Sequence, residues 1–91
     1  MKTAIHLIIK GRVQGVGFRW FAVENARRRN LTGYVKNLIS GDVEVLAEGE
    51  EAQIEDFYLL LKKGPSFSHV TDVDLERKEV TGKYDEFYVE Y

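Results

Sequence analysis

The sequence contains no cysteine, a single proline and no long hydrophobic run. Without cysteine the chain has no thiol nucleophile, no disulfide and no thiolate ligand for a metal ion, and this composition suits a reducing compartment such as the cytoplasm. No apolar stretch approaches the roughly 20 residues that a membrane-spanning helix needs. His6 and Lys10 interrupt the apolar N-terminal segment and no small-residue cleavage site follows it, which does not fit a signal peptide. We therefore expect a soluble cytoplasmic protein without a membrane partner.

A surplus of positive charge is missing as well. The chain carries 13 lysines and arginines against 15 aspartates and glutamates, a formal net charge of −2. A general nucleic-acid binder needs a strong basic surplus to neutralise phosphates. The charge balance therefore predicts no nucleic-acid partner, although it permits a local basic pocket.

What the sequence does contain is the material for a hydrophobic core. Hydrophobic residues make up 44% of the 91 residues and aromatic residues 12%. A domain of this size hides roughly 60 to 70% of its unfolded surface on folding. We expect residues 1–91 to form one domain, a monomer that folds without a metal ion or a cofactor.

The alternation of apolar and polar residues predicts five strands. In the first strand Ile5, Leu7 and Ile9 share one face. The second and third strands form a hairpin around residues 39–41 (Ile-Ser-Gly), where the glycine tolerates positive φ. The predicted strands cover residues 3–10, 32–38, 42–49, 70–80 and 86–91.

Two further segments have apolar residues at helical spacing. The first runs over residues 18–30, and the second runs over residues 50–63 and stops at a Gly-Pro pair. The apolar stripes are Phe18, Phe21, Ala22 and Ala26 in the first helix, and Ile54, Phe57, Tyr58 and Leu61 in the second.

The order of these elements is β-α-β-β-α-β with an extra C-terminal strand. It predicts an α+β fold, a ferredoxin-like α/β sandwich with two helices on one face of a mainly antiparallel sheet. The helical crossover between the first two strands makes them parallel, so their C-terminal ends lie at the same edge of the sheet. Asn37, at the end of the second strand, is therefore expected near the glycine-rich segment that follows the first.

That segment, residues 11–20 (GRVQGVGFRW), leads directly into the first helix. Gly15 and Gly17 allow positive φ, so that successive N–H groups can converge on an anion at the positive end of the helix. Arg19 adds a planar fork suited to phosphoryl oxygens. The loop lacks the Walker pattern and the third glycine of the dinucleotide fingerprint. From spacing alone, a tight strand-to-helix connection with a solvated Arg19 explains these residues about as well as an anion site does.

Two motifs in this order resemble the signatures of the acylphosphatase family. Residues 9–19 (IKGRVQGVGFR) contain the first signature, G-x-V-Q-G-V-x-F-R. Residues 33–37 (GYVKN), followed by Gly41, Val43 and Gly49, are similar to the second. The resemblance spans nearly the whole chain.

This resemblance implies hydrolysis of acyl phosphates to a carboxylate and inorganic phosphate, without a cofactor. It implies that Asn37 orients the attacking water and that Arg19 binds the phosphoryl group, since an arginine, a nest of amides and one amide side chain can do this chemistry. It implies further that the phosphoryl oxygen takes the water proton, so no protein base is needed. The backbone N–H groups that the resemblance assigns to the phosphoryl group are those of Gly15, Val16, Gly17, Phe18 and Arg19.

Other polar residues carry less functional weight. We interpret His6 and His69 as packing or surface residues, because they lie far apart and lack acidic partners at metal-ligand spacing. The arginines at 27–29 are expected to form a solvated charged face with Glu24. Three serines belong to turns: Ser40, Ser66 and Ser68. The acidic residues expected to face solvent are Asp42, Glu44, Glu48, Glu50 and Glu51.

Two other functions compete with hydrolysis. A non-catalytic phosphate- or carbamoyl-phosphate-binding accessory domain is one, because similar domains begin larger hydrogenase-maturation carbamoyltransferases; the end of the chain at Tyr91 argues against it. An RNA-binding module is the other, since ferredoxin-like sheets often stack bases on aromatic residues, but the acidic charge and the lack of an RNP motif count against it. Nothing in the sequence marks a pocket for the acyl group.

Overall fold

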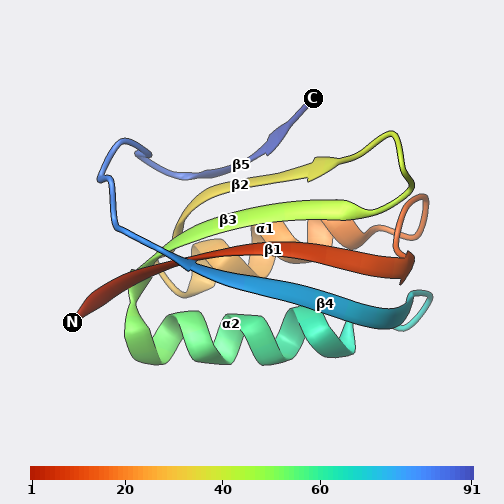
Figure 1. The fold of residues 1–91 in the computed structure, drawn as a ribbon, viewed down its shortest axis with the longest axis horizontal. Helices are drawn as coiled ribbons and strands as arrows, with labels where there is room; N and C mark the ends of the chain where they lie inside the picture. The colour runs from red at the N-terminus through yellow and green to blue at the C-terminus, as the bar shows by residue number, and fades with distance from the viewer.

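Five strands form one sheet in the order β4-β1-β3-β2-β5 (Figure 1). β1 lies between β3 and β4 and is antiparallel to both, β2 is antiparallel to β3, and β5 runs parallel to β2 at the far edge. The strands are β1 (Lys2–Arg12), β2 (Thr32–Asn37), β3 (Val43–Glu50), β4 (His69–Lys78) and β5 (Phe87–Glu90). The predicted α+β sandwich with an extra C-terminal strand is confirmed.

Two helices cover one face of this sheet. α1 (Phe18–Arg28) packs against β2 and β5, and α2 (Glu51–Lys63) packs against β1, β3 and β4. The core between the layers is apolar, and its largest buried side chains are Phe18, Phe57 and Phe87. Along β1 and β3 every second residue enters this core, as the alternation predicted: Ile5, Leu7, Ile9, Val43, Val45 and Ala47.

The ends of the elements differ from the predicted bounds by one or two residues. β1 runs on to Arg12 because β4 continues to pair with it beyond an irregularity between Lys10 and Gly11. α1 ends at Arg28 because the chain then turns through Asn30, whose φ of 56° is left-handed, as is common after a helix.

The prediction that the acidic residues of β3 face solvent is wrong for Glu48 and incomplete for Glu44. Glu48 is only 3% exposed, and its carboxylate accepts hydrogen bonds from the backbone N–H groups of Thr81 and Gly82 and from the Thr81 hydroxyl. Glu44 is half-buried and lies 2.7 Å from His6 Nε2. A buried carboxylate must be hydrogen-bonded, and the donors here come from a connection more than thirty residues further along the chain.

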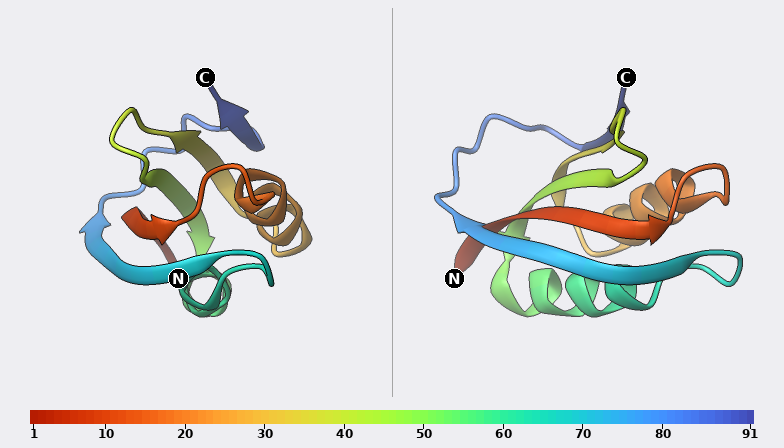
Figure 2. Two further views of the ribbon diagram at one scale, coloured as in Figure 1. Left: turned by 90° about the vertical axis from the view of Figure 1, so that its right-hand side faces the viewer. Right: turned by 45° about the vertical axis from the view of Figure 1, so that its right-hand side comes forward.

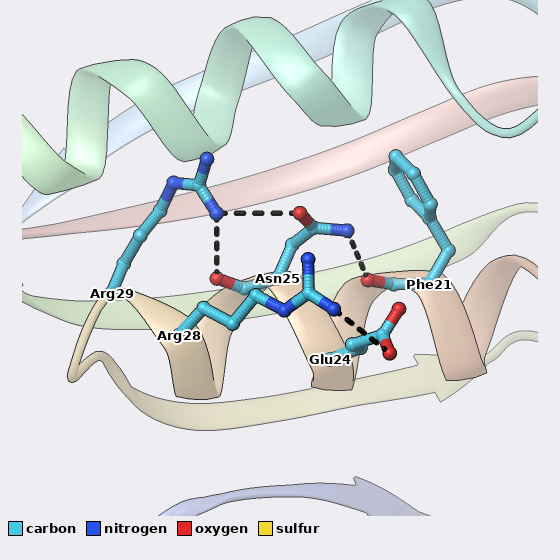
Figure 3. A network of polar contacts seen from close by, with 5 residues as sticks. All are labelled: Phe21, Glu24, Asn25, Arg28 and Arg29. Atoms are coloured by element: carbon cyan, nitrogen blue, oxygen red, sulfur yellow. Dashed lines mark hydrogen bonds and ion pairs between the residues drawn. The ribbon is translucent and has the colours of Figure 1, made fainter.

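The arginines at the end of α1 are more than a solvated face. The predicted pair of Arg28 with Glu24 is present, at 3.4 Å. Arg29, however, donates at 2.7 Å to Asp56 of α2. It also donates to the main-chain oxygen of Asn25 at 3.0 Å and to its side-chain oxygen at 3.3 Å (Figure 3). Arg27 donates at 3.1 Å to the Phe87 carbonyl of β5. Two of the three arginines therefore tie α1 to neighbouring elements.

Gly33 is the position in β2 where the sheet tolerates no side chain. Its φ is +138°, and a Cβ there would overlap the backbone carbonyl of Leu46 on β3. We expect Gly33→Ala to lower the free energy of unfolding by about 3 kcal/mol, because left-handed strain and a backbone clash add. Urea unfolding measures this loss.

The matched control is Gly82→Ala. Gly82 also has positive φ, +68°, but open space surrounds its Cβ position. Only backbone strain applies there, so we expect a loss of about 1 kcal/mol. If Gly33→Ala and Gly82→Ala lowered the free energy of unfolding equally, the close approach of β2 to β3 at Gly33 would not contribute to the cost of a side chain there.

Candidate active site

The loop after β1, the turn after β2 and the C-terminus meet at one end of the molecule (Figure 2). β1 and β2 are each antiparallel to β3 and are therefore parallel to each other. Their C-terminal ends lie side by side, and Asn37 lines the same cavity as the glycine-rich loop. The proximity predicted from the crossover is confirmed.

Gln14 fastens the loop to the neighbouring turn. Its side-chain Nε2 donates to the carbonyl oxygens of Leu38 at 2.8 Å and Asp42 at 2.9 Å, the two residues that close the β2–β3 turn. Gln14 belongs to the first motif, but its sequence context alone predicts no role for it. One feature of the sequence could have indicated this role: an amide side chain with two N–H donors lies next to glycines, whose flexible backbone must be held in place by other contacts.

The loop leaves the positive end of α1 open. Gly15 and Gly17 have φ values of +73° and +78°, and a Cβ at either position would meet nothing within 4 Å. Gly17 is the N-cap, no side chain caps the helix, and the first turn holds no acidic residue. The Phe21 N–H bonds the Gly17 carbonyl at 3.0 Å, so the N–H groups before it have no partner within the helix. This end of α1 can receive an anion.

Arg19 lies in the first turn of α1 without a carboxylate partner. The three arginines at 27–29 each pair with an acid, whereas no ion pair involves Arg19. Its guanidinium carbon lies 5.5 Å from the centroid of the Tyr91 ring, within cation–π range. The aromatic contact supports the guanidinium while its N–H groups stay free for an anionic ligand.

Asn37 ends β2 with a buried, unpaired acceptor. Its Oδ1 is inaccessible and has no hydrogen-bond partner in the protein, the one buried side-chain polar atom of the chain for which this is so. Leaving such an oxygen unpaired costs about 1 to 3 kcal/mol. Asn37 itself is one of the residues that line the cavity at the open helix end.

These groups line one cavity of about 270 Å³. Its lining combines polar groups, from the loop glycines, Arg19 and Asn37, with apolar side chains. None of the lining side chains is acidic. The residues around the cavity are Val13, Gly15, Gly17, Phe18, Arg19, Trp20, Asn37, Val89 and Tyr91.

The remaining sequence candidates lie elsewhere. His6 pairs with Glu44 on the sheet face opposite the helices, and His69 begins β4. No three His, Cys, Asp or Glu side chains are grouped closely enough to hold a metal ion. The longer helix, α2, has 13 residues, and no helix is long and apolar enough to cross a membrane.

The sheet face opposite the helices carries a tyrosine cluster. The ring centroids of Tyr34 and Tyr84 are 6.1 Å apart, and those of Tyr84 and Tyr88 are 6.4 Å apart. Carboxylates accompany the rings: burial and then Glu90 raise the pKa of Tyr88, and Glu44 lies close to Tyr34. Lys83 lies over the Tyr84 ring at 5.4 Å, so charges of both signs border the cluster.

Tyr34 provides a pH-dependent contribution to stability. Partial burial, followed by the negative charge of Glu44, raises the pKa of its phenol from 10.0 to about 12. The folded chain therefore holds this proton more tightly than the unfolded chain does. The resulting contribution to stability is complete below pH 10 and is lost as the pH rises through about 12.

We expect Tyr34→Phe to weaken the dependence of the thermal midpoint on pH across this alkaline range. Tyr91→Phe, which removes an exposed phenol, should leave the dependence as it is in the wild type. Thermal unfolding of the three proteins at several alkaline pH values makes the comparison. A Tyr34→Phe curve parallel to that of the wild type would contradict the assignment.

Comparison with known proteins agrees with the geometry. The family model for acylphosphatase matches residues 5–89. An acylphosphatase of Bacillus pumilus is 43% identical over 84 residues, which are 92% of this chain and 93% of the relative. The crystal structure of acylphosphatase from Bacillus subtilis superposes with a TM-score of 0.94 at 41% identity and covers 100% of both chains. This chain belongs to the acylphosphatase family.

One similar structure is a far larger protein. Full-length HypF, in a phosphate- and nucleotide-bound form, matches 100% of this chain with a TM-score of 0.91 and 37% identity. The match covers only 12% of HypF. The same small fold thus also occurs as a minor part of a longer chain.

Proposed function

We propose that this protein is an acylphosphatase, an enzyme that hydrolyses the carboxyl–phosphate bond of small-molecule acyl phosphates to a carboxylate and inorganic phosphate. One observation carries the proposal: a single cavity combines an uncapped helix N-terminus, an arginine without a carboxylate partner and an asparagine with an unpaired buried oxygen. Family membership supports the same reaction.

The phosphoryl group binds at the loop in this proposal. Backbone N–H groups from Gly15 to Arg19 converge on its oxygens, and the dipole of α1 favours its negative charge. Arg19 donates from its guanidinium to the same oxygens. These donors are preorganised and gain strength as charge builds up on the phosphoryl oxygens, so they stabilise the transition state.

Asn37 orients the attacking water. Its side-chain amide, on a residue that lines the cavity, forms a hydrogen bond with the water and thereby holds the water oxygen in line with the bond that breaks. The new bond forms between this oxygen and phosphorus, and the electron pair of the broken bond leaves with the carboxylate. The water proton passes to a phosphoryl oxygen of the substrate.

Neither a general acid nor a metal ion is required by this chemistry. The leaving carboxylate is already a stable anion at neutral pH, so it needs no proton. Arg19 and the loop amides neutralise the charge of the phosphoryl group, so a metal ion is not needed for that purpose. We propose a cofactor-independent enzyme and retain the cytoplasm as the compartment in which a cysteine-free chain is expected to act.

Hydrolysis of benzoyl phosphate in chelator-treated buffer tests the proposal. We expect rapid turnover that does not change when divalent cations are removed or restored. No turnover above the spontaneous rate, by a protein shown to be folded, would refute hydrolysis. Turnover that disappears with the chelator and returns with a cation would refute cofactor independence.

A second candidate is a phosphate-binding module without hydrolysis. The whole of this fold matches a part of HypF, a protein whose structure holds phosphate. A binding module requires the loop and Arg19 but does not require Asn37 to orient a water. Calorimetric titration with inorganic phosphate alongside the turnover assay separates the two functions, since a binding module binds phosphate and leaves benzoyl phosphate intact.

A further inference from the structure

The cavity also has apolar lining that the handling of the phosphoryl group does not use. Its apolar side chains include Val13, Trp20, Val89 and Tyr91, and the Tyr91 ring also contacts the Arg19 guanidinium. We propose that this apolar lining binds the acyl group and that the protein prefers acyl phosphates whose acyl group is a planar aromatic ring. The inference rests on the proposed function, since it assigns the other half of the same substrate.

Trp20 is the main observation behind this proposal. It is the chain's single tryptophan and the residue is 70% exposed. The core-facing residues of α1 are Phe18, Ala22, Val23 and Ala26, so the helix does not need Trp20 for packing. A tryptophan that the core leaves uncovered, and that lines a cavity beside an open helix end, is available to stack on a ligand ring.

The charges around the cavity orient such a ligand. Arg19 is the only charged side chain in the lining, and no aspartate or glutamate side chain is part of it. A doubly charged phosphoryl group belongs with this cation and the loop amides, which leaves the acyl carbon and its substituent to the apolar lining. A substituent that itself carries charge or strong hydrogen-bonding groups would lose hydration there without gaining partners.

The size of the cavity is compatible with such a substituent. At about 270 Å³ it lies just below the roughly 300 Å³ at which sites for drug-sized ligands begin. A phosphoryl group together with one ring is a ligand of this size class. A methyl or amino group, as in acetyl or carbamoyl phosphate, would reach the phosphoryl site and leave the Trp20 ring uncovered.

Binding of two phosphonates tests the inference without relying on turnover. In phenacylphosphonate and acetonylphosphonate a CH₂ group replaces the bridging oxygen, so neither compound can be hydrolysed at that bond. We expect the wild type to bind the phenacyl compound about tenfold more tightly in calorimetric titration. We expect Trp20→Ala to reduce this ratio to about two, and Trp20→Phe to keep most of it because a ring remains.

Phe67→Ala is the matched control. Phe67 is an aromatic residue that is 82% exposed, in the connection before β4, but it does not line the cavity. Its replacement should leave the ratio unchanged. A wild-type ratio near one, or a Trp20→Ala ratio equal to that of the wild type, would overturn the inference. The inference would also be overturned if Trp20→Ala changed the sedimentation of the protein but left the ratio of the two phosphonate affinities unchanged. That result would assign Trp20 to a contact between protein molecules.

Turnover separates the failure of this inference from the failure of the proposed function. We expect kcat/KM for benzoyl phosphate to exceed that for acetyl phosphate, with the difference mainly in KM, and we expect Trp20→Ala to narrow the gap. If both substrates are hydrolysed equally well and the phosphonates bind equally well, the acyl preference is wrong and hydrolysis stands. If neither substrate is hydrolysed while the phosphonate ratio holds, hydrolysis is wrong and the aromatic preference stands.

Discussion

Replacing Arg19 with alanine is expected to lower kcat/KM for benzoyl phosphate by at least about a thousandfold and to abolish measurable inhibition by inorganic phosphate. Arg19 is the only cationic side chain on the cavity wall, and no carboxylate competes for it. A thousandfold loss corresponds to about 4 kcal/mol of transition-state stabilisation. Steady-state kinetics with phosphate as the competitor measures both effects.

Folding should be almost unaffected by this change, because Arg19 makes no ion pair and its one aromatic contact is with an exposed ring. Arg28→Ala is the matched control, since it removes an arginine from the same helix whose partner is Glu24 at the surface. Arg19→Lys keeps the charge but loses the planar fork and should recover only part of the activity. A folded Arg19→Ala protein with normal phosphate inhibition would remove Arg19 from the site.

Asn37→Ala is expected to lower kcat by about a hundredfold to a thousandfold and to leave the inhibition constant of phosphate within about threefold of the wild-type value. The amide is assigned to the water, whereas the oxygens that the phosphoryl group brings with it are held by Arg19 and the loop amides in the phosphate complex as well. The variant also removes an unpaired buried oxygen, so its free energy of unfolding should not fall in the way that a lost hydrogen bond would make it fall.

Lys36→Ala is the control for this position. Lys36 precedes Asn37 on β2, and its side chain is on the other face of the sheet, away from the cavity. A weakened phosphate affinity in Asn37→Ala that matches its loss of kcat would assign the amide to the phosphoryl group instead of the water. Comparing Arg19→Ala with Asn37→Ala is informative because both residues line the same cavity. The first change is predicted to weaken phosphate inhibition, whereas the second is predicted to lower kcat and leave that inhibition nearly unchanged.

Much of the fold followed from short-range patterns in the sequence. The alternation of Ile5, Leu7 and Ile9 identified the buried face of β1, and the helical spacing of Ile54, Phe57 and Leu61 identified that of α2. Such periodicities depend on the geometry of one element and on the need to bury one of its sides. The bounds were less accurate, because the end of a strand depends on how far its partner continues, as β4 does beside β1.

The position of the candidate site also followed from the sequence. A crossover helix makes the strands at its two ends parallel, and this rule alone brings Asn37 to the loop that holds Gly15 and Arg19. The chemical roles of these residues did not follow from that rule. They came from the resemblance to a family, and they stay predictions until the variants are measured.

The sequence by itself determined the order of the elements, the layer in which each apolar stripe lies and the end of the sheet that carries the loop. Only the tertiary structure decided which polar groups are buried and which apolar groups are not. Glu48 is buried because donors at Thr81 and Gly82 reach it, Arg29 is tied down because Asp56 lies opposite, and Trp20 stays exposed because no element covers that side of α1. Each of these outcomes depends on segments far apart in the chain, and a pattern within one element contains no information about what the fold places beside it.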